Sequence, residues 1–273
     1  MLCFPNAKIN LGLNIAEKRP DGFHNLQTVF YPISLCDVLE FVRSDGDGVS
    51  VLFQNTGIET GAAHSDDLCV KAYELLKKDF SLPSLSIHLH KIIPVGAGLG
   101  GGSSDAACML TALNKIFNLG LTLTDLVDYA SRLGSDCAFF VYNEPSYAWN
   151  KGDSMRGISL DLHQYYLILV YPNIHISTAE AYSSVKPAMP DLSPETVVKM
   201  PVDEWKYYLT NDFEPFVFSA YPEVAEIKQK LYNMGADFAA MSGSGSAVYG
   251  LFRSSPEKTK EHFKDYFVWK GKL

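Results

Sequence analysis

The chain has 273 residues, 47% of them hydrophobic and 20% charged, a composition typical of a folded globular protein rather than a disordered one. Lys and Arg number 23 and Asp and Glu 31, so the formal net charge is −8, which disfavours nucleic acid or an anionic membrane surface as a partner. The five cysteines are widely spaced without a CxxC pair, which argues against a disulfide framework or a structural zinc site.

The first predicted element is a strand over residues 7–15. Its odd positions are apolar and its even positions are polar or glycine, the period of a strand with one buried and one polar face. No basic segment followed by an apolar core precedes it, so no secretory signal is expected. Pro20-Asp21-Gly22 indicates a turn, and a second strand is expected over residues 29–42, interrupted near Pro32.

Helices and strands are mixed in the rest of the chain. Helices are expected over residues 66–80, 104–117, 123–133 and 222–234, and strands over residues 85–89, 165–171 and 248–252. The most apolar of these runs, 165–171, is too short to span a bilayer, and we expect a soluble cytoplasmic protein. Residues 143–153 are polar and turn-rich and form the expected domain boundary. Since helices and strands do not alternate strictly, the predicted fold class is α+β.

A glycine-rich segment, PVGAGLGGGSSDA over residues 94–106, carries the strongest functional signal. Glycines let the backbone approach a ligand closely, and the helix that follows adds the N–H groups and the positive dipole end of its first turn. Two serines add hydroxyl donors. The segment predicts a phosphate-binding loop made of Pro94, Val95, Gly96, Ala97, Gly98, Leu99, Gly100, Gly101, Gly102, Ser103 and Ser104.

Three other interpretations of this segment are weaker. A Walker P-loop is excluded because no GK[ST] closes the loop. The dinucleotide-binding fingerprint matches formally as Gly96-x-Gly98-x-x-Gly101, but the preceding strand is half polar and Pro94 occupies its exit. A merely flexible surface turn would need neither a strand before it nor a helix start after it.

Three segments together are similar to the GHMP kinases, the superfamily of galactokinase and of homoserine, mevalonate and phosphomevalonate kinases. Residues 94–106 resemble its phosphate-binding motif, PNAKINL (5–11) its N-terminal motif and SGSGS (242–246) its C-terminal glycine motif. The resemblance covers nearly the whole chain. It implies a two-lobed fold, with an N-terminal ribosomal-protein-S5-like domain over residues 1–153 and a C-terminal ferredoxin-like domain over residues 154–273. It also implies ATP, accompanied by Mg²⁺, as the phosphate donor.

Four features resemble the branch of the superfamily that phosphorylates a cytidine diphosphate sugar alcohol for non-mevalonate isoprenoid biosynthesis. They are PNAKINLGL (5–13), DGFH (21–24), GSDCAFF (134–140) and NDFE (211–214). Two alternatives stay open: a GHMP kinase of another small alcohol such as homoserine, and a non-catalytic nucleotide or sugar sensor on the same scaffold. A dinucleotide oxidoreductase is a more distant third.

The resemblance implies that Lys8 and Asp136 form the catalytic pair. Taken alone, Asp136 is equally a turn or N-cap residue, and Lys8 a solvated strand lysine. Phosphoryl transfer to an alcohol, however, needs a group that takes the hydroxyl proton, and a neighbouring lysine would keep that carboxylate ionised. Asn10 shares the polar strand face with Lys8 and is an expected substrate-binding residue.

By the same resemblance, Phe23, His24 and Tyr182 are expected to bind the cytosine, with Phe23 and Tyr182 stacking on the base and His24 bonding its edge. No His, Cys or Asp cluster has transition-metal spacing, so Mg²⁺ would be held mainly by phosphate oxygens and water. Two positions depart from the family pattern: Ala138 stands where proline is usual, and residues 149–153 replace a Gly-Arg-Gly-Glu-like stretch.

Overall fold

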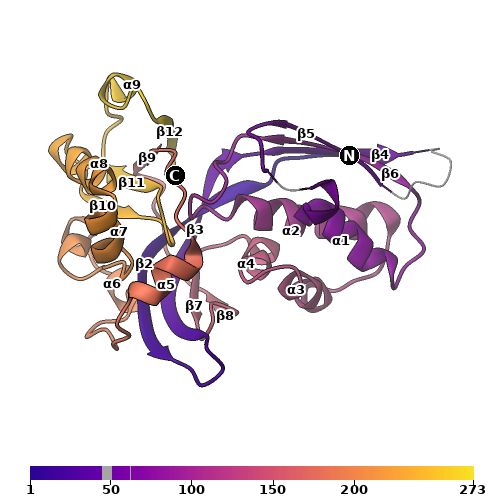
Figure 1. Cartoon of the computed structure of the whole chain (residues 1–273), viewed down its shortest axis with the longest axis horizontal. Helices are drawn as coiled ribbons and strands as arrows, with labels where there is room; N and C mark the ends of the chain where they lie inside the picture. Colours follow the sequence, from indigo (N-terminus) through magenta and orange to yellow (C-terminus); the bar gives the residue numbers. More distant parts are fainter. Residues whose placement is uncertain (45–50, 62) are drawn as a thin grey trace. The chain divides into compact units, whose positions relative to one another are not determined.

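The computed structural model describes residues 1–44, 51–61 and 63–273, which form two compact units (Figure 1). The first unit comprises Met1–Ala7, Leu35–Val95 and Gly100–Asn143, and the second comprises Lys8–Ser34, Gly96–Leu99 and Glu144–Leu273. The units are therefore interleaved in sequence, and the division into domains over residues 1–153 and 154–273 stays a prediction. Residues 146–149, inside the predicted boundary segment, form a strand of a sheet in the second unit.

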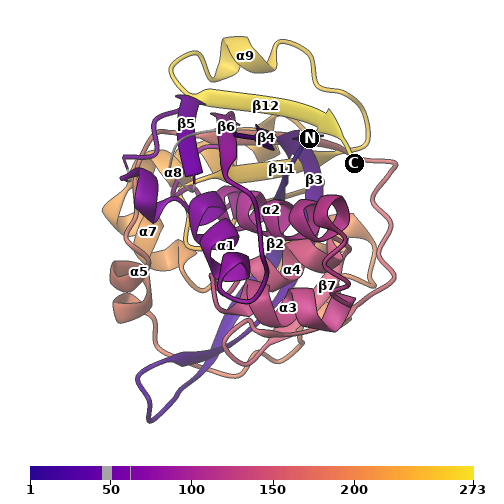
Figure 2. The same ribbon diagram turned by 90° about the vertical axis from the view of Figure 1, so that its right-hand side faces the viewer.

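The first unit is a four-stranded sheet with helices on one face. Its strands, in spatial order, are β1 (Leu2–Cys3), β4 (Val38–Arg43), β6 (Leu85–Lys91) and β5 (Val51–Gly57). Strand β5 runs parallel to β6, and the other pairs are antiparallel. Its helices are η1 (His64–Asp66), α1 (Leu68–Lys77), α2 (Gly101–Phe117), α3 (Leu123–Ser131) and α4 (Cys137–Tyr142). Figures 1 and 2 show α1 and α2 lying along one face of this sheet.

The core of the first unit is packed between this sheet and its helices. Leu85, Ile87 and Leu89 of β6 are at most 1% exposed, and they belong to one cluster with Tyr73 of α1 and Leu110 of α2. Burying such side chains contributes about 1.5–3 kcal/mol each. This packing confirms the predicted two-faced strand and fixes the position of α2, the helix that opens with the last glycines of the 94–106 segment.

The second unit contains two four-stranded sheets. The first consists, in spatial order, of β2 (Asn6–Lys18), β3 (His24–Cys36), β7 (Ser146–Trp149) and β8 (Ser154–Gly157), and the second of β10 (Phe238–Met241), β11 (Val248–Phe252), β9 (Tyr166–Tyr171) and β12 (Phe267–Lys272). Its helices are α5 (Thr178–Ser184), α6 (Pro194–Val197), η2 (Val202–Tyr207), α7 (Glu214–Ala220), α8 (Pro222–Asn233) and α9 (Thr259–His262). One apolar cluster joins Ile15 of β2, Ile168 of β9 and Phe213.

Strand β2 has the predicted apolar and polar faces, and both of them are buried. Residues 7–15 are all buried, and Lys8, Asn10 and Asn14 are at most 5% exposed. The polar face is covered because segments far along the chain pack on it. Polar side chains buried in this way need hydrogen-bond partners, and these partners define the site described below.

Two element boundaries also differ from the prediction. Strand β3 runs through Pro32, and the chain leaves the strand only at Asp37. The missing N–H of Pro32 is tolerated because β7 pairs only with residues 28–30 of β3. Helix α2 begins at Gly101, three residues earlier than predicted, so two glycines form its first turn. No helix within the described chain is both long and apolar enough to cross a membrane.

Candidate active site

The first part of the glycine-rich segment, Gly96–Leu99, belongs to the second unit and is bound on two sides. The Lys8 N–H donates to the Leu99 carbonyl at 3.0 Å, and the Ala247 N–H donates to the Ala97 carbonyl at 3.2 Å. The Ser242 hydroxyl donates to the Gly98 carbonyl at 2.9 Å. The structure thus brings residues 97–99 of the glycine-rich segment, the N-terminal motif and the C-terminal glycine motif together, although they are far apart in sequence.

Gly98 is a position that only glycine can occupy. Its φ is +80°, a conformation that residues with a side chain rarely adopt. A Cβ placed there would lie 2.0 Å from the Ser242 carbonyl oxygen, which is far inside van der Waals contact. The close approach of two backbones therefore requires glycine at this point of the loop.

The C-terminal glycine motif, residues 242–246, is the turn that connects β10 to β11. The Asn211 amide donates to the carbonyls of Met241 and Gly243 at 2.9 and 2.8 Å. The Ser242 hydroxyl also accepts the Asn10 N–H at 3.2 Å. Asn211 is 3% exposed, so this turn is fixed from the protein interior, beside residues 96–99 of the glycine-rich segment.

Lys8 and Asn10 form a buried polar network on β2. The Lys8 ammonium donates to Asn10 Oδ1 at 2.5 Å and lies 4.9 Å from the centroid of the Phe30 ring. Asn10 Nδ2 donates in turn to the Thr28 hydroxyl at 2.9 Å. Lys8 is 3% exposed, so the interpretation as a solvated strand lysine is wrong. A buried ammonium is an effective electrostatic group because little water screens it.

The remainder of the segment, Gly100–Ser104, belongs to the first unit and leads into α2. The N–H groups of the first turn of a helix have no acceptor within the helix and form an anion-binding end. Burial raises the pKa of the Cys137 thiol to about 11, while a hydrogen bond with the Ser103 side chain acts in the opposite direction. That hydrogen bond places the start of α4 beside the first turn of α2.

Asp136 stands directly before Cys137, at the N-cap position of α4, and is half-buried. Its φ of −84° and ψ of −12° are helical, and its side chain makes no capping hydrogen bond to the described backbone of α4. The interpretation of Asp136 as a capping residue is therefore not supported. Asp136 belongs to the first unit and Lys8 to the second, so their pairing stays a prediction.

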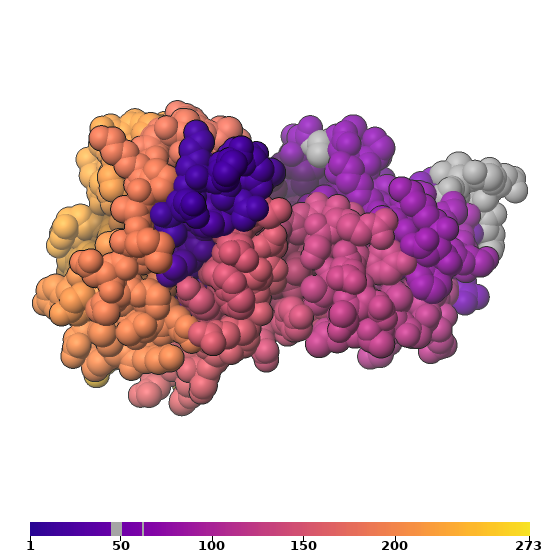
Figure 3. Space-filling view, turned by 90° about the horizontal axis from the view of Figure 1, so that it is seen from below, coloured from indigo at the N-terminus to yellow at the C-terminus, as the bar shows by residue number. Residues whose placement is uncertain are grey.

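The predicted cytosine-binding residues lie at the β2–β3 hairpin and on α5, both in the second unit. The rings of His24 and Tyr182 are stacked, with centroids 5.0 Å apart, and Phe213 contacts Tyr182 edge-on. Phe23 is 59% exposed, and the Lys151 ammonium lies 5.2 Å from its ring centroid. Figure 3 shows the N-terminal hairpin, in indigo, at the surface of the molecule.

Burial, reinforced by the nearby Lys18 ammonium, lowers the pKa of His24. The ring is therefore neutral at pH 7, with one nitrogen that donates and one that accepts. This state suits hydrogen bonding to the edge of a base. Residues 149–153, which differ from the family pattern, lie beside this hairpin, because the Lys151 ammonium contacts the Phe23 ring.

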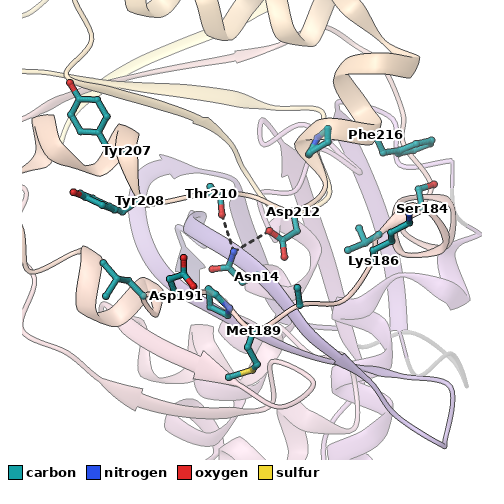
Figure 4. Close-up of a pocket in the computed structure, with 15 residues that line it drawn as sticks. Asn14, Ser184, Lys186, Met189, Asp191, Tyr207, Tyr208, Thr210, Asp212 and Phe216 are labelled. Carbon is teal, nitrogen blue, oxygen red and sulfur yellow. Dashed lines mark hydrogen bonds between the residues drawn. The ribbon is translucent and has the colours of Figure 1, made fainter.

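A cavity of about 590 Å³ opens elsewhere in the second unit, near the middle of β2 (Figure 4). Asn14 lies at its base, where its amide donates to Thr210 Oγ1 at 3.0 Å and to Asp212 Oδ1 at 3.1 Å. Asp212 Oδ2 also accepts the Ile15 N–H at 2.7 Å. Through Asp212, the NDFE segment (211–214) is attached to β2.

Sequence reasoning missed a buried ion cluster of Lys91, Asp37 and Asp105 in the first unit. A signal for it was present, because Lys91 continues the odd-numbered register of Leu85, Ile87 and Leu89 and so stands on the buried face of β6. Among the described residues, no group of three His, Cys, Asp or Glu side chains converges as a metal site.

Comparison with known proteins agrees with this arrangement. A sequence model of the GHMP kinases N terminal domain matches residues 67–144, and one of the GHMP kinases C terminal region matches residues 201–268. The chain belongs to the GHMP kinase family, whose members are ATP-dependent kinases of small molecules. It is 50% identical over 273 residues to the 4-diphosphocytidyl-2-C-methyl-D-erythritol kinase of Bacteroides fragilis, and 100% of each chain is covered.

Solved structures confirm the α+β fold. A crystal structure of 4-(cytidine 5'-diphospho)-2C-methyl-D-erythritol kinase matches with a TM-score of 0.83 and 30% identity, covering 99% of this chain and 98% of the other. A homoserine kinase from Cytophaga hutchinsonii matches with a TM-score of 0.64 and 16% identity, covering 98% and 95%. The similarity to this homoserine kinase, at 16% identity, shows a shared fold and nothing about the substrate.

Proposed function

We propose that the protein transfers the γ-phosphate of ATP to the 2-hydroxyl of 4-diphosphocytidyl-2-C-methyl-D-erythritol, a step in non-mevalonate isoprenoid precursor biosynthesis. The full-length identity of 50% to the Bacteroides fragilis kinase supports this substrate. The observation that carries the proposal is the packing of Gly96–Leu99 against both Lys8 and Ser242, because it joins three kinase motifs in one unit.

In this proposal the triphosphate binds to the backbone of residues 94–104. The glycines at 96, 98 and 100 have positive φ angles, a backbone conformation in which successive N–H groups can converge on an anion. The first turn of α2 adds further N–H groups and its dipole. Ser103 supplies a hydroxyl donor at the same end of the helix. Phosphoryl transfer relies chiefly on such positioning and charge stabilisation.

Asp136 takes the proton of the acceptor hydroxyl in the proposed reaction, and Lys8 supplies positive charge. Asp136 is suited to this role because it stands next to Cys137, which is hydrogen-bonded to Ser103, at the phosphate-binding end of α2. Lys8 is suited because its ammonium is buried and oriented by Asn10. Both groups reduce the barrier by stabilising charge that develops during transfer.

Mg²⁺ enters with ATP in this proposal and is held mainly by phosphate oxygens and water. The Ser103 hydroxyl fits the ion, since it is a hard oxygen donor in the first turn of α2. When bound, Mg²⁺ neutralises part of the phosphate charge.

The other proposed partners follow from composition. A net charge of −8 favours small-molecule substrates over nucleic acid or membrane partners, and the five cysteines are free, which suits a reducing cytoplasm.

The substrate assignment is tested by coupled measurement of ADP formation with purified protein, ATP and Mg²⁺. We expect turnover with the cytidine substrate and none with homoserine, and we expect CMP to raise the melting temperature. Turnover with homoserine alone would assign the protein to the rival class of small-alcohol kinase. Nucleotide binding without turnover of any acceptor would instead indicate a sensor.

Phe23→Ala should weaken binding of the cytidine substrate without affecting ATP. Loss of a base–aromatic stack is worth roughly 1–3 kcal/mol, so we expect the KM of the cytidine substrate to rise about tenfold. Tyr207→Ala is the matched control, since Tyr207 is 69% exposed in the same unit and lies outside the proposed site. An unchanged KM for the cytidine substrate in Phe23→Ala would refute the stacking role.

A further inference from the structure

A lysine stands at a core position immediately before the phosphate loop. Lys91 ends β6 on the face occupied by Leu85, Ile87 and Leu89, and it is only 3% exposed. A buried ammonium is strongly destabilising unless it is paired and hydrogen-bonded. Its presence three residues before Pro94 therefore calls for a role beyond filling the core.

Two buried carboxylates hold this ammonium. Lys91 Nζ forms ion pairs with Asp37 Oδ2 and, at 2.7 Å, with Asp105 Oδ2. Asp37 is fully buried between β3 and β4, and its Oδ1 accepts the N–H groups of Ile92 at 2.5 Å and Ile93 at 2.8 Å. Asp105 is 2% exposed and lies near the start of α2. One ammonium thus links the β3–β4 connection, the exit of β6 and α2.

The first turn of α2 rests directly on this cluster. A Cβ at Gly101 would lie 3.2 Å from Lys91 Nζ and 2.9 Å from Ile93 Cγ2. A Cβ at Gly101 would therefore clash with Ile93 and contact the ammonium tightly, so glycine lets this turn pack closely against both. The same turn contains the N–H groups that the proposed function assigns to phosphate binding.

We propose that Lys91, held by Asp37 and Asp105, is a positioning residue for ATP: it fixes the first turn of α2 against the end of β6 and so sets the placement of the phosphate-binding N–H groups. This inference rests on the proposed function, and all of its residues belong to the first unit. Preorganised donors of this kind are most effective when their own positions are fixed by buried contacts.

The charge state of the cluster supports this role. Burial raises the pKa of Asp105 to about 8, although Lys91 opposes the shift, and Asp105 Oδ1 has no hydrogen-bond partner among the described residues. Burial alone would lower the pKa of Lys91, but the carboxylates of Asp105 and Asp37 outweigh it and raise that pKa. Asp105 therefore releases its proton at a higher pH than an ordinary aspartic acid, so its negative charge beside the phosphate-binding turn grows as the pH rises.

Other titratable groups also surround Asp105, and each belongs to an element packed against it. They are Lys91 of β6, Asp37 before β4, Asp67 at the N-cap of α1, Cys69 of α1 and Cys108 of α2. Of these, Lys91 is hydrogen-bonded to Asp105. Burial raises the pKa of Asp67 as well, which makes Asp67 the appropriate control for a pH effect.

Lys91→Met tests the positioning role. We expect its KM for ATP to rise about tenfold or more, with less than about a twofold change in the KM for the cytidine substrate, since only the phosphate-binding turn loses its anchor. Lys91→Arg keeps the charge and should recover part of the ATP affinity. Direct titration with a non-hydrolysable ATP analogue compares the nucleotide affinities of these variants without turnover.

Asp105→Asn supplies a second test in case Lys91→Met does not fold. Asparagine keeps an acceptor for Lys91 and resembles the protonated acid. The KM for ATP of the unmodified enzyme should rise about fivefold from pH 7 to pH 9, as Asp105 ionises beside the phosphate site, and this rise should be absent in Asp105→Asn. Asp67→Asn should keep the rise.

A stability measurement gives a readout independent of activity. The folded chain keeps the Asp105 proton up to about pH 8, whereas the unfolded chain loses it near its ordinary value of 3.8. Rising pH therefore destabilises the unmodified protein between these values. The melting temperature of Asp105→Asn, relative to the unmodified protein, should increase from pH 5 to pH 8 and stay level above it.

The outcomes separate this inference from the proposed function. If the unmodified protein binds no nucleotide, both fail. If it binds nucleotide and every Lys91 and Asp105 variant keeps its ATP affinity and its pH profile, the positioning role alone is overturned. Parallel loss of affinity for ATP and for the cytidine substrate would show a merely structural role, and it would overturn the inference as well.

Discussion

We expect Asp136→Asn to lower kcat by at least ~10²-fold while the affinity for ATP stays nearly unchanged, since general-base catalysis contributes roughly 10²–10⁴-fold. Asparagine has the same shape as aspartate but cannot accept the hydroxyl proton. ATP affinity should persist because the loop N–H groups assigned to the triphosphate belong to residues 94–104. Steady-state kinetics with both substrates, together with nucleotide titration, separate the two quantities.

The matched control for this variant is Asp128→Asn, which makes the same chemical change on the exposed side of α3 in the same unit. It should keep kcat and both KM values. Near-normal turnover in Asp136→Asn would contradict the assignment of Asp136 as the base. A large rise in the KM for ATP without a fall in kcat would instead indicate that Asp136 acts on the nucleotide or its metal.

Gly98→Ala should abolish measurable ATP binding and destabilise the fold by about 2–4 kcal/mol. The new Cβ would adopt a φ of +80° and lie 2.0 Å from the Ser242 carbonyl oxygen, so one of the two backbones must move. That movement breaks the hydrogen bond from Ser242 to the Gly98 carbonyl and separates the loop from the C-terminal glycine motif. Thermal unfolding and titration with an ATP analogue measure the two effects.

Gly235→Ala distinguishes the backbone clash from the unfavourable φ. Gly235 has a φ of +93° in the same unit, but nothing lies within 4 Å of a Cβ built there. This control should lose only about 1 kcal/mol of stability and keep its ATP affinity. Equal losses in both variants would mean that the contact between Gly98 and Ser242 does not hold the loop.

The sequence alone correctly predicted the elements and motifs that depend on neighbouring residues. The alternation in residues 85–89 predicted β6, and Gly134 lies just beyond the helix predicted over 123–133, which ends as α3 at Ser131. The glycines of 94–106 predicted a loop before a helix, because no other residue adopts a positive φ as readily. The family assignment followed from three such motifs and is confirmed by the relatives.

The prediction failed where a distant segment changes the environment of a residue. Taken alone, Lys8 could be a solvated lysine on the polar face of a strand, but contacts with residues 99 and 242–249 enclose that face. Pro32 predicts a break in its strand, but β3 continues through it, because the neighbouring strand β7 pairs only with residues 28–30. The stacking of His24 on Tyr182 joins residues 158 positions apart, which no window of sequence contains.

By itself, then, the sequence determined the family, the α+β class and the residues that carry each motif, because backbone conformation and periodicity depend on near neighbours. Only the tertiary structure decided which polar groups are buried and what they bind: Lys8 with Asn10, Gly98 with Ser242, and Lys91 with Asp37 and Asp105. Burial and ion pairing depend on which surfaces meet when the chain closes on itself, and that is set by the packing of whole elements.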